Sequence, residues 1–188
     1  MTAPATPKLQ LTAHSYHLRY LVDEDRILLS VALSPESELG MPVTRRLLRN
    51  LLEALAKLVA ERRPAPMIAA AAAANPAMRE TVLDLEHGQS VAKAVAEGSM
   101  KDERREKPLA VPPKLVREVN ILTKTDGALA LVFDNGDQAL TLEISPDRIH
   151  MVIATFVQMA ERAGWDLAPA ASWMGAKPAP APANKVLN

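Results

Sequence analysis

Histidine pairs are the first place to look for metal or acid–base chemistry in this chain of 188 residues. Its four histidines are His14, His17, His87 and His150, and no two of them have the i, i+4 spacing that puts two imidazoles on one helix face. In a strand, His14 and His17 would point to opposite faces and could not share an ion. We therefore predict no metal site and expect ordinary surface or capping histidines.

Carboxylate clusters are the second candidate for chemistry, at residues 23–25 and at Asp134 with Asp137. Neither has the spacing of a calcium loop, and each lies where a hairpin must turn, a position that favours aspartate. Cysteine is absent, and so are the glycine patterns of phosphate cradles and nucleophile elbows. We predict no catalytic residue, no cofactor and no small-molecule ligand, and we expect a protein that is not an enzyme.

Cationic side chains are the remaining candidates for a functional surface. The predicted contact residues are Arg45, Arg46, Arg49, Lys57, Arg62, Arg63 and Arg19. All but Arg19 lie on or just after one predicted helix, on the side opposite its apolar positions. A charge run usually serves as a solvated face, and the alternative is contact with a partner or with nucleic acid. Lys plus Arg and Asp plus Glu are equal, at 22 each, so any basic surface must be local.

The elements that position these side chains repeat along the chain. Residues 16–62 and 117–163 align without a gap at a constant offset of 101 residues, as Leu39 and Leu140 illustrate. In each half, alternating apolar residues predict three antiparallel strands, and helical spacing then predicts one long helix. One such unit buries too little apolar surface alone. The predicted fold class is α+β: a tandem duplication of a βββα unit that forms a pseudo-dimer, with an additional linker helix.

Local turn signals are clearest in the second half. The Asp-Gly pair at 126–127 and the Asn-Gly pair at 135–136 predict hairpin turns, because these residues tolerate positive φ angles. In the first half, Pro42 limits its strand to a sheet edge, since proline has no backbone N–H. Residues 128–133 are apolar on both faces. This predicts that the other repeat, the linker helix or another subunit covers the second face of that sheet.

The predicted organisation has five parts. Residues 1–13 form a disordered tail, 14–63 the first repeat, 64–108 an alanine-rich linker with one helix and a charged segment, 109–167 the second repeat, and 168–188 a disordered Ala/Pro tail.

Two details of the linker and the tail bear on function. The linker helix is expected to begin at Asn75-Pro76 and to pass through Met78, Val82 and Leu85. Trp165 is expected to pack over the end of the last helix. Trp173, in the tail, would be exposed and could serve as a short docking motif.

Tandem repeats of a sheet and a helix that form a pseudo-dimer resemble the topology of the Whirly and PUR single-strand-binding families. Those families have four strands in each repeat, whereas three are predicted here. Residues 9–12 and 109–111 would supply extra short strands, although Pro112-Pro113 interrupts the second. The resemblance implies binding of single-stranded nucleic acid through the arginine-rich helix, but topology does not assign function, and aromatic residues for base stacking make up only 3% of the chain.

Two functions follow from these observations. The first is a non-catalytic interaction or scaffold module, which self-associates or binds a protein partner; the alternative is the single-stranded nucleic-acid binder. The longest uncharged run is alanine-rich and too short to span a bilayer, and the N-terminus lacks the apolar core of a signal peptide. We therefore expect no membrane partner and a cytoplasmic location.

Overall fold

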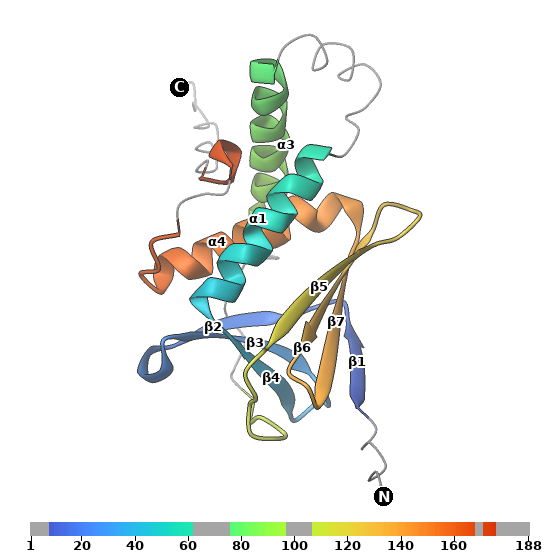
Figure 1. Ribbon diagram of the computed structural model, residues 1–188, viewed down its shortest axis with the longest axis vertical. Coiled ribbons are helices and arrows are strands. Elements are labelled where there is room, and N and C mark those ends of the chain that lie inside the picture. Colours follow the sequence, from blue (N-terminus) through green and yellow to red (C-terminus); the bar gives the residue numbers. More distant parts are fainter. Residues whose placement is uncertain (1–7, 62–75, 97–106, 168–170, 176–188) are drawn as a thin grey trace, which may run out of the picture.

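The computed structural model describes residues 8–61, 76–96, 107–167 and 171–175, and within these ranges the protein is α+β with two sheets and three α-helices (Figure 1). The strands are β1 (Leu9–Ala13), β2 (His17–Leu21), β3 (Arg26–Ala32), β4 (Glu38–Val43), β5 (Glu118–Thr123), β6 (Leu129–Asp134) and β7 (Gln138–Ile144). The α-helices are α1 (Arg45–Glu61), α3 (Pro76–Ala96) and α4 (Ile149–Arg162). Short 3-10 turns are η1 (Val22–Glu24), η2 (Pro146–Arg148) and η3 (Ser172–Gly175).

The larger sheet differs from the smaller one by an additional strand that pairs in parallel. The smaller sheet has the order β2-β3-β4 and is antiparallel throughout. The larger sheet has the order β1-β7-β6-β5, and β1 pairs with β7 in parallel. In Figure 1 the strands β5, β6 and β7 cross those of the smaller sheet steeply, and α1 and α4 lie together beyond them.

One segment from each half of the chain pairs with a sheet of the other half. Strand β1 precedes β2 in sequence but pairs with β7 of the larger sheet. In the same way, the backbone around Leu109 runs parallel to the start of β4: Glu38 N donates to the Pro108 carbonyl at 3.0 Å, and Ala110 N donates to the Glu38 carbonyl at 2.9 Å. The helices cross over as well, since α4 contacts β2 and α1 contacts β5.

One apolar core joins both sheets to the helices. It includes Leu29 and Met41 of the smaller sheet, Leu131 and Phe133 of the larger sheet, and Phe156 of α4, all fully buried. Tyr16 stacks on Phe156, with ring centroids 5.8 Å apart and an interplanar angle of 11°. Burial raises the pKa of Tyr16 to about 12.

The second face of the smaller sheet is covered by the chain itself. Leu28 and Ser30 of β3 are buried there. A methyl group added at Gly40 of β4 would lie 2.9 Å from the side chain of Leu109 and 3.0 Å from that of Leu28. Leu109 therefore packs over this face, where glycine leaves room for it. As expected of a proline-bearing strand, β4 is an edge of its sheet.

The second face of the larger sheet is only partly covered, contrary to the prediction for residues 128–133. Ala130 is buried, but Val132 is only half-buried, and Leu122 beside Ala130 in the ladder stays 55% exposed. Polar Gln10 and Asn120 on the same face are exposed. The other strands of this sheet therefore place polar residues on this face, as expected of a sheet surface that faces solvent.

Both predicted tails contain ordered elements. Residues 9–13 form β1 because their backbone pairs with β7, and residues 172–175 form η3. Within the linker, α3 runs from Pro76 through Gly88 to Ala96 without a break. Residues 1–7, 168–170 and 176–188 of the tails, and residues 62–75 and 97–106 of the linker, lie outside the described residues.

Candidate interaction surfaces

Helix α1 carries most of the predicted contact residues. Its start is capped by Thr44, whose Oγ1 accepts a hydrogen bond from Leu47 N at 3.1 Å. Its apolar side is buried against the core, whereas Arg45, Arg46 and Arg49 are exposed. No acidic residue lies in its first turn. Cations at a helix N-terminus oppose the helix dipole, so these arginines do not serve helix formation.

The predicted contact residues differ in their surroundings. Arg45 donates from Nη2 to the Asp166 carbonyl at 2.8 Å, which links the start of α1 to the end of α4. Lys57 is exposed and forms an i, i+4 ion pair with Glu61 at 4.0 Å. Arg19 is exposed on β2. Arg62 and Arg63 lie outside the described residues. Among the predicted contact residues that the structure describes, the arginines of the first two turns of α1 are the ones grouped together.

A polar contact at Asp25 closes the turn that follows β2. One carboxylate oxygen accepts hydrogen bonds from the Trp165 indole at 2.6 Å and from the Tyr20 hydroxyl at 2.9 Å. These two donors hold the pKa of Asp25 below its usual value. The backbone of Asp25 is left-handed, with φ of 48°, a conformation that aspartate tolerates better than most residues. Trp165 packs over the end of α4, as predicted.

The aromatic residues are all at least half-buried. Trp165 meets Tyr20 edge-on, with centroids 6.3 Å apart, and both phenylalanines belong to the core. Half-buried Tyr16 and Tyr20 pack against the same core. None of these rings is fully exposed, whereas single-strand binders commonly stack bases on exposed aromatic rings.

Two histidines and a tryptophan meet where α3 packs on α4. His87 of α3, His150 of α4 and Trp173 of η3 form a triangle with ring centroids 5.3–5.5 Å apart. The sequence predicted a surface or capping role for the histidines and an exposed Trp173. Instead, His87 and Trp173 are buried, together with Met174. No local pattern indicated this, because the three rings come from distant parts of the chain.

This cluster predicts a pH dependence of stability. Burial lowers the pKa of His87, although Asp84 opposes the shift. Because the unfolded chain then takes up the proton more readily, stability is full above the unfolded pKa of about 6.5 and declines as the pH falls below it. Urea unfolding at about pH 7.5 and pH 5.5 measures this loss, which we expect to shrink in His87→Phe. An equal loss in both proteins would contradict the assignment to His87.

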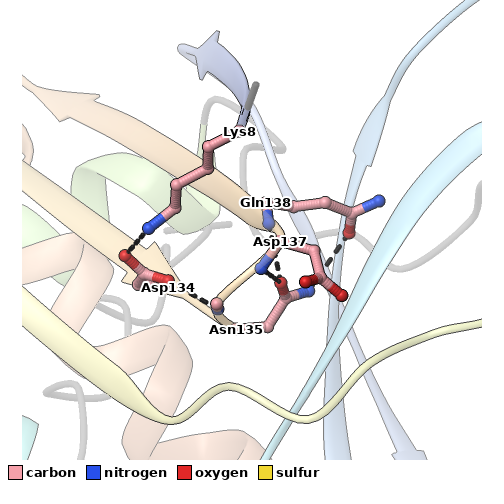
Figure 2. Close-up of polar contacts among 6 residues, drawn as sticks. Lys8, Asp134, Asn135, Asp137 and Gln138 are labelled. Carbon is pink, nitrogen blue, oxygen red and sulfur yellow. Dashed lines mark hydrogen bonds and ion pairs between the residues drawn. The ribbon is translucent and has the colours of Figure 1, made fainter. Parts of the chain in front are cut away.

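The β6–β7 turn gathers the acidic residues that resembled cation ligands. The side-chain carbonyl of Asn135 accepts from the backbone N–H groups of Asp137 at 3.1 Å and Gln138 at 2.8 Å (Figure 2). Lys8 pairs with Asp134, and Lys114 pairs with Asp137. These lysines hold the pKa of each aspartate below its usual value. The aspartates therefore serve the turn, as predicted, and tie it to the segments before β1 and β5.

The outward face of α3 carries apolar side chains without a cover in the described structure. Its inward face has buried His87 and Val91, whereas Met78 is 50% and Leu85 is 60% exposed. In Figure 1 the N-terminal turns of α3, in green, extend past α1 and α4. The apolar residues that predicted this helix thus lie mainly on its solvent side.

Exposed Met78 and Leu85 belong to a regular spacing that also includes half-buried Val82 and polar Gln89. From Met78 the steps alternate between four and three residues, through Val82, Leu85, Gln89, Ala92 and Ala96. We call these six residues the α3 seam. This spacing is the heptad pattern by which one helix packs along another. The sequence contained this signal, but it predicted a helix without showing which side faces solvent.

No metal centre or membrane span was found in the described part of the chain. Three or more side chains of His, Cys, Asp or Glu do not converge there to bind an ion. None of its helices is both long and apolar enough to cross a bilayer. Comparison with protein families, curated proteins and solved structures finds no match to this chain.

Proposed function

We propose that this chain is a non-catalytic protein-interaction module whose contact surface is the α3 seam. The observation that carries the proposal is the exposure of Met78 and Leu85 on a heptad-spaced face of an ordered helix. Apolar side chains arranged in this way gain free energy when a second helix covers them. Helix α3 can present them because His87 and Val91 fix its opposite side.

We also propose that the scaffold is a pseudo-dimer of two βββα units. The element order β2-β3-β4-α1 returns as β5-β6-β7-α4, with η2 before the second helix, which supports a duplication. Reciprocal pairing of β1 with β7 and of the Leu109 segment with β4 adds a fourth segment to each unit. A scaffold of this kind leaves α3, which lies between the units in sequence, available for a separate task.

A photo-crosslinking residue at position 85 tests the interaction. Leu85→benzoylphenylalanine should yield one discrete protein adduct, because its side chain lies in the contact. Leu122→benzoylphenylalanine is the matched control, since Leu122 is 55% exposed on the face of a sheet, against 60% for Leu85. Equal labelling from the two positions would contradict the proposed function.

The arginines of α1 define the competing outcome, a nucleic-acid interface. Fluorescence anisotropy with a single-stranded oligonucleotide at low salt measures it, because phosphate contacts are strongest there. Binding that Arg49→Glu abolishes and Leu85→Ser leaves intact would replace the proposed function with the nucleic-acid alternative. Zero net charge and the lack of a fully exposed aromatic side chain favour the protein partner.

A further inference from the structure

We infer that the partner of the α3 seam is a second copy of this chain, whose α3 packs antiparallel to the first. This inference rests on the proposed function and adds the identity and direction of the partner. It is carried by the charges that flank the seam: Arg79, Glu86 and Lys93 follow one another at intervals of seven residues. They therefore form a single line along one border of the seam.

The sign of these charges alternates along the border. In an antiparallel helix pair, equivalent borders of the two helices face each other, so this line meets its own copy. When Val82 packs against Leu85 of the second copy, Arg79 lies beside Glu86 of that copy. Two-fold symmetry produces the same contacts a second time. The two contacts between Val82 and Leu85 and the two ion pairs between Arg79 and Glu86 therefore form in the same register.

Neighbouring registers are disfavoured by the same charges. A shift by one heptad in one direction places Arg79 beside Arg79 of the second copy. A shift by one heptad in the other direction places Glu86 beside Glu86, and Arg79 beside Lys93. Like charges in such positions are destabilising. A shift by two heptads restores opposite charges, Glu86 with Lys93, but replaces Met78 and Val82 in the contact with alanines.

A parallel arrangement does not use these charges. In a parallel pair the border with Arg79 and Glu86 would face the other border of the seam, which carries Thr81, Gly88 and Val95. Within the described residues, neither Arg79 nor Glu86 forms an ion pair in its own chain. Both charges are therefore available to a second copy in the antiparallel register.

The position of the register along α3 fits the shape of the molecule. The contact is centred between Val82 and Leu85, in the N-terminal half of α3, and the N-terminal turns of this helix extend past α1 and α4 (Figure 1). Two copies can approach there with their sheets apart. A contact of about four helical turns buries less than the roughly 1,200 Å² of a standard interface, so we expect a weak, concentration-dependent dimer.

A charge exchange in the full-length chain tests the inference by sedimentation equilibrium. Arg79→Glu alone and Glu86→Arg alone should each weaken dimerisation by about tenfold, because each turns two attractions into two repulsions. The double variant should restore the dimer to within about threefold of the original. Arg49→Glu and Glu53→Arg are the matched controls, since both residues are exposed on α1, and they should leave the dimer unchanged.

Cysteine pairing provides a second measurement, because the natural chain has no cysteine. Arg79→Cys mixed with Glu86→Cys should form a disulfide-linked dimer under mild oxidation, faster than either variant alone.

Failure of both the charge rescue and the mixed disulfide would overturn the inference. If the crosslink from position 85 contains a different polypeptide, the antiparallel homodimer is wrong while the interaction function stands. If position 85 gives no adduct, the function itself is wrong.

Discussion

Replacing Trp165 by alanine is expected to lower the free energy of unfolding by about 3–5 kcal/mol, the range for a buried aromatic side chain. Trp165 is buried and belongs to the shared core. Its ring also meets Tyr20 edge-on, and its indole donates to Asp25 across 140 residues of sequence. The change therefore leaves a cavity and separates the end of α4 from the turn after β2.

Trp165→Phe is the control that isolates the packing of the ring. It keeps an aromatic side chain against Tyr20 but removes the donor to Asp25, so we expect a smaller loss than in the alanine variant. Urea unfolding followed by far-UV circular dichroism measures both, without dependence on tryptophan emission. A loss below about 1 kcal/mol for Trp165→Ala would show that the two halves are not coupled through this residue.

The elements that the sequence predicted well are those with local causes. The hairpin turns at Gly127 and Gly136 occur where expected, with φ angles of 82° and 98°. The alternation of apolar residues placed the six strands β2 to β7, and helical spacing placed α1 and α4. Each signal depends on neighbouring residues alone, since a turn or an amphipathic helix is specified within a few positions.

The elements that the sequence missed depend on distant partners. Strand β1 has five residues and lies in a tail predicted to be disordered, where residues 9–12 are at most a candidate for an extra short strand; it forms because its backbone pairs with β7. The burial of His87 depends in the same way on Trp173, which arrives from the far end of the chain. Such contacts leave no periodicity in the sequence, so they could be learned only from the fold.

The candidate site was predicted in part. The arginines of α1 are exposed, as their spacing indicated, and among the described contact residues Arg45, Arg46 and Arg49 lie together. The α3 seam was visible as apolar spacing, which usually marks a buried face. Its opposite side carries His87 and Ser90, which sequence patterning assigns to solvent. The helix is buried there because it packs against α4 and η3, where Trp173 meets His87, so the apolar seam is left outside.

Replacing Trp173 by alanine is expected to cost about 3–5 kcal/mol, most of it in the docking of α3. Trp173 is buried between His87 and His150, and η3 contacts both α3 and α4. Most helical stability in proteins comes from tertiary packing rather than from intrinsic propensity, so α3 depends on these contacts. Hydrogen exchange should show lost protection for Pro76–Ala96, while β3 and β6 keep theirs.

The same variant links the buried cluster to the surface of α3. Trp173 contacts the inward side of α3, so it cannot touch a second copy bound to the seam. If the seam is presented only while α3 is docked, Trp173→Ala weakens dimerisation and also lowers the hydrogen-exchange protection of α3. Trp173→Phe should reduce each of these less than Trp173→Ala does. A variant that loses the protection of α3 but dimerises as before would show that the contact lies elsewhere, because an unfolded α3 cannot hold Val82 and Leu85 on one face.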